Sequence, residues 1–312
     1  MNNYITIDGG TTNTRLRLVR AGDIVSEERF SMGAKDCLSG NIAYKELTKN
    51  KIKDLLSKSQ MTEKDITAIL ASGMLTSEAG LYHAPYVEAP AGIGSLHRAM
   101  KSANVGISSI PCYFIPGVKI SSENTDFCEV MRGEESEFIG LASLMEPSSV
   151  CILPGSHTKH IFFDDDKNIT SFRTFLTGEM FSAIAQNTIL LSSVDMSVSK
   201  FDESYLLLGY DKAGELGVNR ALFHTRIMDK LFGKNKKELY SYFLGVILRD
   251  DVSSLADCKR HIYVGGKHQL RESILYLIRN RLNLSASAID ETYSEFASTR
   301  GAIQIFEYGE EK

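Results

Sequence analysis

Two short stretches of the chain combine glycine with hydroxyl and amide side chains in an order that suits phosphate binding. The first is DGGTTN at residues 8–13 and the second is LPGSHTK at residues 153–159. Glycines let the backbone approach a ligand closely, and the neighbouring N–H and hydroxyl groups can point at phosphate oxygens. The candidate contacts are Gly9, Gly10, Thr11, Thr12 and Asn13 in the first stretch, and Gly155, Ser156, His157, Thr158 and Lys159 in the second.

Asp8 stands directly before the glycines of the first stretch. A carboxylate cannot itself bind a phosphate, but it makes sense beside one when a divalent cation lies between them, usually held through water. The sequence therefore favours Mg²⁺ as a ligand of Asp8. A plain β-hairpin with a glycine-rich turn is the alternative that this stretch alone leaves open.

Each stretch lies between two apolar runs of strand character, at 4–7 and 16–19 for the first and at 149–153 and 160–163 for the second. The sequence therefore predicts two β-hairpins of similar design. Strand and helix patterns alternate along the whole chain, which indicates an α/β fold. Helical patterns cover residues 43–59, 94–103, 135–144, 178–190, 239–248 and 270–281.

The length and composition limit the classes of protein to consider. With 312 residues, the chain is expected to form two domains with a cleft between them. A net charge of −4 gives no support for binding to nucleic acid or to a membrane surface. No apolar run reaches the about 18 to 20 residues of a membrane span, and the chain does not start with a signal peptide, so we expect a cytoplasmic location. The five cysteines contain no Cys-x-x-Cys pair, which argues against a disulfide framework or a thiolate metal site.

A strand-to-helix turn late in the chain is a third candidate for ligand binding. The apolar residues 262–264 lead into Gly265 and Gly266, which precede the helical pattern at 270–281. Two glycines at such a point suit a nucleotide base or ribose that lies flat on the backbone. A tight turn without a ligand is the alternative. The sequence contains neither a P-loop motif nor a complete dinucleotide-binding fingerprint, so those two kinds of nucleotide site are not expected.

Taken together, two hairpin phosphate loops and a late strand-Gly-Gly-helix element resemble the actin/hexokinase/Hsp70 superfamily of ATP-binding proteins. Within that superfamily, the chain is similar over nearly its whole length to the 2-dehydro-3-deoxygalactonokinases. The blocks that carry the similarity lie at 7–13, 72–74, 84–86 with Pro90, 130–135, 153–159, 174–179 and 243–246. The chain differs from that family's usual pattern at Gly9 and His160, where the family typically has tryptophan.

The resemblance implies an ATP-dependent kinase that phosphorylates 2-dehydro-3-deoxy-D-galactonate at the 6-hydroxyl and releases ADP. It also implies two ribonuclease-H-like domains with nucleotide in the cleft, one at 1–146 and one at 147–293, and a C-terminal helix at about 294–312 that packs back on the first. A kinase of the same fold for another small sugar or hydroxy acid stays open, as do a phosphatase and an ATP-binding regulator without transfer chemistry. Whether the chain forms a homodimer is open too.

Glu134 and Glu135 are the candidates for the catalytic base. Phosphoryl transfer to an alcohol needs a carboxylate that takes the proton of the hydroxyl. In sugar kinases of the superfamily this base opens the helix before the second phosphate hairpin, where Glu134 and Glu135 stand, and related phosphate-hydrolysing members favour Glu135 slightly. Stabilisation of the helix start by negative charge is the structural alternative.

Several residues in the similar blocks are candidates for contact with the sugar acid. A helix start offers N–H groups to an anion, and a planar guanidinium suits a carboxylate best. Ordinary loop and core packing is the alternative for each of them, and the sequence does not choose among the arginines. The candidates are Ser72, Gly73, Met74, Tyr86, Arg132, Arg173, Thr177, Gly178, Glu179 and Arg226.

Overall fold

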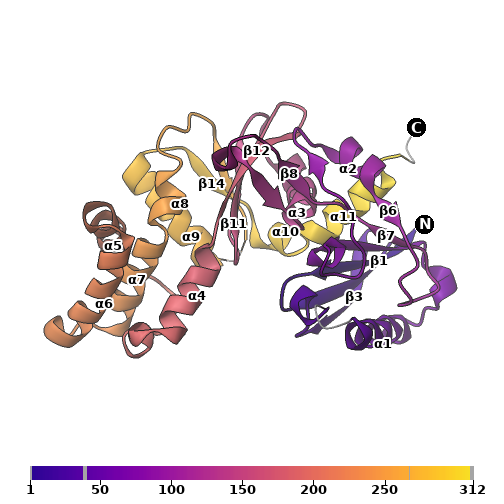
Figure 1. Cartoon of the computed structure of the whole chain (residues 1–312), viewed down its shortest axis with the longest axis horizontal. Helices are drawn as coiled ribbons and strands as arrows, with labels where there is room; N and C mark the ends of the chain where they lie inside the picture. Colours follow the sequence, from indigo (N-terminus) through magenta and orange to yellow (C-terminus); the bar gives the residue numbers. More distant parts are fainter. Residues whose placement is uncertain (1, 38–40, 267, 310–312) are drawn as a thin grey trace. The chain divides into compact units, whose positions relative to one another are not determined.

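A computed structural model describes residues 2–37, 41–266 and 268–309, and the chain divides into two compact units (Figure 1). The segment Asp164–Ser171, which the sequence analysis counts with the second domain, belongs to the first unit. The first unit comprises Met1–Met145, Asp164–Ser171 and Phe296–Lys312, and the second comprises Glu146–Phe163 and Phe172–Glu295.

A six-stranded sheet in the order β3-β2-β1-β4-β7-β6 forms the centre of the first unit, and a three-stranded sheet in the order β5-β8-β9 accompanies it. The strands are β1 (Asn3–Gly9), β2 (Thr14–Arg20), β3 (Asp23–Phe30), β4 (Ala68–Gly73), β5 (Val87–Glu88), β6 (Lys101–Ser102), β7 (Cys112–Phe114), β8 (Val118–Ile120) and β9 (Glu129–Met131). The helices are α1 (Ile42–Lys58), α2 (Ile93–Ala99), α3 (Glu134–Leu141) and α11 (Ala297–Glu307), with the short 3₁₀ turns η1 (Ala34–Cys37) and η3 (Met74–Thr76).

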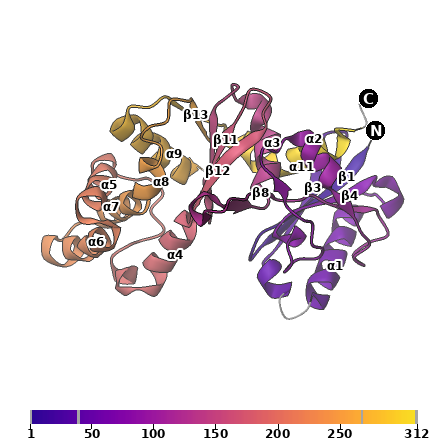
Figure 2. The ribbon, with the colours of Figure 1, turned by 45° about the horizontal axis from the view of Figure 1, so that its top comes forward.

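Strand β1 buries both of its faces, because helices cover the sheet on each side (Figures 1 and 2). Ile5 and Ile7 point into the apolar core that the sheet forms with α1. Thr6 points the other way, and its Oγ1 lies 3.2 Å from Oγ1 of Thr299 on α11. Side chains alternate along a strand, so Asp8 also lies on the α11 side, at the carboxyl end of β1.

Helices α3 and α11 cross with their backbones in contact. A Cβ atom on Gly301 would overlap the Ser136 carbonyl oxygen, and a Cβ atom on Gly140 would overlap the Ala297 carbonyl oxygen. Glycine normally weakens a helix interior by about 1 kcal/mol relative to alanine. The two glycines therefore allow the backbones of the two helices to touch, and this contact holds α11 against α3.

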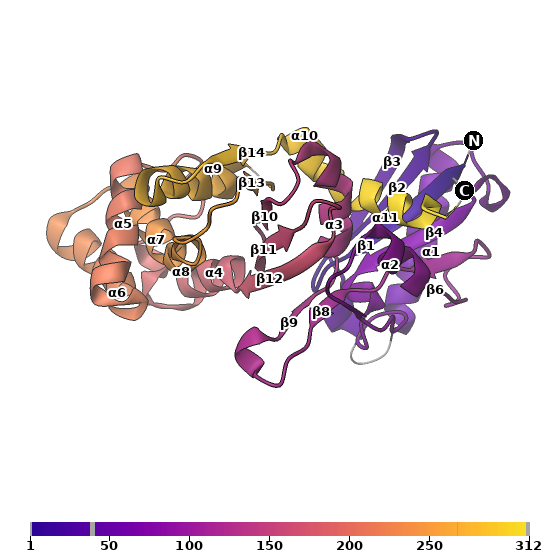
Figure 3. The ribbon, with the colours of Figure 1, turned by 90° about the horizontal axis from the view of Figure 1, so that it is seen from above.

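The second unit contains most of a five-stranded sheet in the order β12-β11-β10-β13-β14, in which the first residues of β12 belong to the segment Asp164–Ser171 of the first unit. Its helices α5, α6 and α7 pack side by side (Figures 1 and 3). The strands are β10 (Val150–Leu153), β11 (Thr158–Phe163), β12 (Ile169–Phe175), β13 (Ile262–Val264) and β14 (Ala286–Ala288). The helices are α4 (Thr177–Asn187), α5 (Glu203–Leu216), α6 (Val218–Phe232), α7 (Lys236–Ile247), α8 (Arg249–Ser253), α9 (His268–Leu277) and α10 (Glu291–Glu295), with the 3₁₀ turn η6 (Ile189–Ser192).

Helix α7 is the central helix of the second unit. It begins with a complete capping box, in which Asn235 and Glu238 each accept the other's backbone N–H with a side-chain oxygen. Its residues from 239 to 247 are all buried, and it lies close to α5 because Gly209 and Gly245 leave room for the facing backbone. No helix among the described residues is both long enough and apolar enough to cross a membrane.

We expect Gly301→Ala to destabilise the first unit. The added methyl group overlaps the Ser136 carbonyl oxygen, and overpacking of this kind costs about 1 to 3 kcal/mol, although alanine has the better helix propensity. Urea unfolding measures the free energy. Gln304→Ala, at an exposed position of the same helix, is the control and should change the stability by less than about 0.5 kcal/mol. An equally stable Gly301→Ala chain would contradict the tight crossing.

Candidate active site

The first glycine-rich stretch forms the turn between β1 and β2, as predicted. The Gly10 N–H donates to the Asn13 carbonyl at 2.8 Å and closes the turn. The carbonyl oxygens of Gly10 and Thr11 accept N–H groups at the start of η1, at 3.1 and 3.2 Å. These carbonyls are therefore held away from a ligand, while the side chains of residues 11–13 are exposed to solvent.

Asp8 lies at the end of β1, opposite Ser72 of β4 in a parallel register. The Ser298 hydroxyl at the start of α11 donates to Oδ2 of Asp8 at 3.3 Å. Burial raises the pKa of Asp8 above its usual value, while Arg15 opposes the rise and Glu134 adds to it. The carboxyl group thus stands at the meeting point of two strand ends and two helix starts.

Glycines bring these segments within contact distance. Gly73 and Gly133 both have positive φ angles, +76° and +113°, which residues with a Cβ rarely adopt. A Cβ atom on Gly73 would lie 2.5 Å from the Gly9 carbonyl oxygen, and one on Gly133 would lie 3.0 Å from the Gly73 Cα. The end of β1, the end of β4 and the start of α3 therefore touch through backbone alone.

The two predicted base candidates differ in their surroundings. Glu135 is 0% exposed, and the Gly133 N–H donates to both of its carboxylate oxygens, at 2.9 and 2.7 Å. Burial raises the pKa of Glu135 to about 8, and the charge of Glu134 adds to the rise. Glu134 is half-buried, and its Oε2 accepts the Arg132 N–H at 3.1 Å. The side chain of Glu135 is thus buried in the protein interior, whereas that of Glu134 is partly exposed to solvent.

Glu137 is a third carboxylate that the sequence analysis does not single out. Burial raises its pKa to about 8, and the nearby charges of Asp8 and Glu134 add to the rise. Residues three apart lie on the same face of a helix. The spacing from Glu134 to Glu137 could therefore have indicated Glu137 as a further site residue. Asp8, Glu134 and Glu137 therefore form one group of mutually repelling carboxylates in the first unit.

Arg132 is a structural residue in this arrangement. Its Nη1 donates to the carbonyl and the hydroxyl of Thr76, both at 2.7 Å, and its Nη2 donates to the Ala84 carbonyl at 3.0 Å. Its guanidinium lies 4.1 Å from the centre of the Tyr86 ring, and the residue is only 8% exposed. Arg132 fixes the segment that carries Tyr86, and the structure does not present it as a binding group for the substrate carboxylate.

The second glycine-rich stretch joins β10 to β11, as predicted, and rests on the start of α4. The Gly178 N–H donates to the carbonyls of Gly155 and Ser156 at 3.2 and 3.1 Å, and the Glu179 N–H donates to Ser156 at 3.2 Å. These are the N–H groups that the sequence analysis offers to the sugar acid. In the structure the hairpin carbonyls accept both of these N–H groups, and the role of this segment in binding the sugar acid stays a prediction.

Side chains of the second hairpin differ in exposure. Nε2 of His157 lies 3.2 Å from Oε1 of Glu179, and both side chains reach solvent. Thr158 and Lys159, in contrast, are buried. The sequence analysis expects Lys159 to reach a phosphate oxygen, whereas the structure makes His157 the exposed basic side chain of the hairpin.

The Gly265-Gly266 turn lies next to the second hairpin within the same unit. The Gly265 N–H donates to the Ile152 carbonyl at 2.9 Å, which continues the β10–β13 pairing. Gly266 has a φ angle of +82°, and a Cβ atom on it would lie 3.2 Å from Cδ of Pro154. The structure therefore brings these two sequence-predicted elements together.

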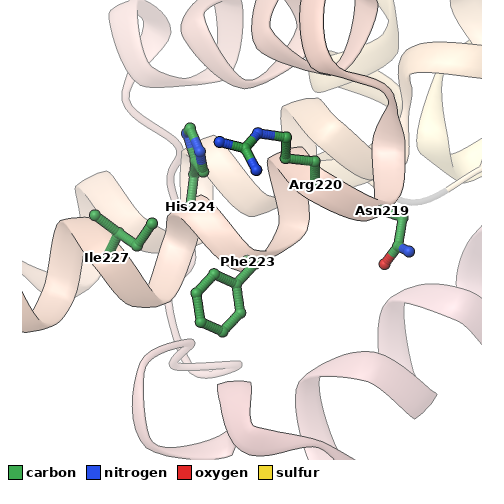
Figure 4. A pocket seen from close by; sticks show the side chains of 5 residues that line it. All are labelled: Asn219, Arg220, Phe223, His224 and Ile227. Carbon is green, nitrogen blue, oxygen red and sulfur yellow. The ribbon is translucent and has the colours of Figure 1, made fainter.

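The remaining arginine candidates hold neighbouring backbone. Nη1 of Arg173 donates to the Ser254 carbonyl at 2.7 Å, and Nη1 of Arg226 donates to the Ile189 carbonyl at 3.2 Å. A pocket lies along one helix, α6, which also carries Arg226 (Figure 4). Its lining consists of Asn219, Arg220, Phe223, His224 and Ile227.

Comparison with known proteins decides the family. The family model described as 2-keto-3-deoxy-galactonokinase matches residues 8–303. The chain is 29% identical over 267 residues to the 2-dehydro-3-deoxygalactonokinase of Escherichia coli (strain K12), which covers 83% of this chain and 82% of that protein.

The chain belongs to the 2-keto-3-deoxy-galactonokinase family.

Two solved structures have a similar fold. A Sinorhizobium meliloti protein assigned as a 2-dehydro-3-deoxygalactonokinase superposes with a TM-score of 0.76 at 22% identity, covering 96% of each chain. The activator of 2-hydroxyisocaproyl-CoA dehydratase from Clostridium difficile, with bound ADPNP, superposes with a TM-score of 0.54 at 14% identity, covering 99% and 96%. The predicted family, kinase function and actin-like ATPase fold are confirmed. ATP as a substrate follows from membership of a kinase family with this fold.

Glu135 gives this family member a testable dependence of stability on pH. The pKa of Glu135 is about 8 in the folded chain, against a usual value of 4.5. Its contribution to stability is therefore fully present below about pH 4.5 and is lost as the pH rises through about 8. We expect the unchanged chain to lose stability relative to Glu135→Gln over this range, as measured by urea unfolding at a series of pH values. Parallel curves for the two chains would contradict the buried position of the carboxyl group.

Proposed function

We propose that the chain transfers the γ-phosphoryl group of ATP to the 6-hydroxyl of 2-dehydro-3-deoxy-D-galactonate, with ADP and 2-dehydro-3-deoxy-6-phosphogalactonate as products. The observation that carries the proposal is the family match over residues 8–303. The name of the Escherichia coli relative supports the choice of sugar acid. Two glycine-rich turns, each at the end of a buried strand, support the use of a triphosphate.

The ATP phosphates are assigned to the two turns. In the first turn, exposed hydroxyl and amide groups surround backbone N–H groups. In the second, the carbonyls of Gly155 and Ser156 bond to α4 and not to a ligand, and the exposed imidazole of His157 supplies a polar group beside the turn. Gly265 and Gly266 are assigned to the nucleoside, since they lie next to the second turn.

Asp8 is the proposed ligand of Mg²⁺. Among the described residues, no group of three or more His, Cys, Asp or Glu side chains could hold a metal ion by itself. This fits a Mg²⁺ ion that binds with ATP, because such an ion needs only one or two carboxylates besides phosphate oxygens and water. When bound, the ion offsets negative charge on the transferring phosphoryl group.

Glu134 is the better supported catalytic base. The sequence analysis slightly favours Glu135, but the burial of Glu135 and its two contacts with the Gly133 N–H suit a residue that holds the start of α3. Glu134 is partly exposed and stands beside Asp8, so an acceptor hydroxyl can approach it close to the proposed magnesium ligand. A base of this kind takes the hydroxyl proton as the oxygen attacks phosphorus.

Sugar-acid binding is assigned to side chains near these groups. Ser72, Gly73, Met74 and Tyr86 lie in or next to the segment that Arg132 fixes in the first unit. Glu179 and Arg173 are partly or fully exposed in the second unit and keep the proposed role of binding the sugar acid. A cytoplasmic location stays a prediction from the sequence, and whether the chain forms a homodimer stays open.

Conservative replacement of the glutamates tests the assignment. We expect Glu134→Gln to lower kcat by about 10² to 10⁴, because a general base contributes this much, with little change in the KM for ATP. Glu135→Gln should lower kcat less. Glu129→Gln, on the preceding strand, is the matched control and should keep its activity. Release of ADP by a coupled assay, with a panel of 2-keto-3-deoxy sugar acids, measures all four chains.

Two outcomes of this experiment would count against the proposal. If Glu134→Gln keeps more than about a tenth of the activity, Glu134 is not the base. If the unchanged chain releases ADP no faster with any sugar acid of the panel than without one, the proposed reaction is wrong.

A further inference from the structure

Helix α4 begins without a side-chain cap of its own. The residue before it is Leu176, whose side chain cannot accept a hydrogen bond from the first N–H groups. The carbonyls of the second hairpin accept the N–H groups of Gly178 and Glu179 instead. The contact is close, because a Cβ atom on Gly178 would lie 2.5 Å from the Gly155 carbonyl oxygen. The position of the hairpin therefore depends on the position of the first turn of α4.

A buried carboxylate fixes that first turn. The hydroxyl of Thr177, the first residue of α4, donates to Oδ2 of Asp251 at 2.5 Å. Both residues are only 3% exposed, and they lie 74 positions apart in the sequence. Burial raises the pKa of Asp251 to about 6, although the Thr177 hydroxyl opposes the rise. A carboxylate is costly to bury and is normally kept only where it makes such a bond.

The helix that carries Asp251 is itself tied to the sheet. Residue Ser254 follows α8, and its carbonyl accepts a hydrogen bond from Arg173 of β12 at 2.7 Å. Its hydroxyl lies 3.4 Å from Nδ1 of His160 on β11 and donates to the Asp251 carbonyl at 2.7 Å. Asp251 is therefore anchored to strands β11 and β12, and strand β11 leads out of the hairpin.

We propose that Asp251 is a positioning residue for the ATP phosphates: through the Thr177 hydroxyl it holds the first turn of α4, which in turn holds the hairpin at Gly155 and Ser156. The inference rests on the proposed role of this hairpin in ATP binding. It also gives Thr177 a role in this chain of contacts in place of direct contact with the sugar acid. Asp251 itself does not touch ATP.

A purely structural residue would behave differently from a positioning residue. Loss of a buried hydrogen bond lowers the stability of the second unit in either case. Only a positioning residue also weakens ATP binding. Amide exchange at Gly178 and Glu179 reports directly on whether the hairpin still caps α4.

The test compares three single variants, and the double variant that combines Asp251→Leu with Thr177→Val, with a matched control. Asp251→Leu and Thr177→Val remove the bond at similar volume, while Asp251→Asn keeps an oxygen that can accept it. Thr225→Val is the control, because Thr225 is a fully buried threonine of the same unit whose hydroxyl has no hydrogen-bond partner. Equilibrium binding of a non-hydrolysable ATP analogue, the two KM values and amide exchange are measured on the full chain.

We expect Asp251→Leu and Thr177→Val to weaken binding of the analogue and to raise the KM for ATP by about tenfold, which corresponds to one hydrogen bond to a charged group. Exchange at Gly178 and Glu179 should speed up by a similar factor. Asp251→Asn should stay within about threefold of the unchanged chain, and the double variant should be no worse than either single one, since both remove the same bond. Thr225→Val should change none of these values.

The outcomes separate failure of this inference from failure of the proposed function. If the unchanged chain binds the analogue but Asp251→Leu and Thr177→Val bind it as Thr225→Val does, Asp251 does not position the hairpin. Additive losses in the double variant would also overturn the inference. If the unchanged chain does not bind the analogue, the proposed function fails, and amide exchange still decides whether Asp251 holds the hairpin on α4.

Discussion

Contact between backbones at glycine residues is the constraint on which both candidate phosphate turns depend. In the first unit, Gly73 and Gly133 let two strand ends and a helix start touch beside Asp8. In the second, Gly178 lets the hairpin lie on the start of α4. A side chain at any of these positions would separate the segments by the width of a methyl group or more. The glycines of the sequence motifs thus serve the protein's own packing as well as the approach of a ligand.

Electrostatic repulsion shapes the first unit around this contact. The charge of Glu134 adds to the rise in pKa of both Asp8 and Glu137, and the charge of Asp8 adds to the rise at Glu137, while Arg15 opposes the rise at both. A group of carboxylates that repel one another favours the arrival of a cation. This is consistent with a substrate that brings its own Mg²⁺ ion.

Local motifs made much of this structure predictable from the sequence. The two hairpins follow from small residues between alternating apolar runs, and α1 and α7 follow from helical periodicity. Helices α5 and α6 were not predicted. In α5, Leu206, Leu207 and Leu208 form a continuous apolar run, and in α6 the large apolar residues Phe223 and Leu231 are exposed. In such helices the apolar residues do not follow the spacing of a single buried helix face, so helical periodicity does not reveal them.

Contacts between distant parts of the chain could not be read from the sequence. Arg132 is indistinguishable by type and spacing from an arginine that binds a carboxylate, and only its bonds to Thr76 and Ala84 show its structural role. Asp251 stands in a short acidic run that is typical of a solvated helix start. Its bond to Thr177 exists only because the fold brings α8 to the start of α4.

Helix α11 gives the first unit an unusual order of assembly. The hydroxyls of Ser298 and Thr299 complete the surroundings of Asp8 and Thr6, which belong to the first strand of the chain. During translation, nearly 300 codons separate these partners. The part of the first sheet that α11 covers must therefore stay uncovered until α11 has been made. A premature stop before α11 would remove this cover, even though every candidate ATP-binding residue had already been made.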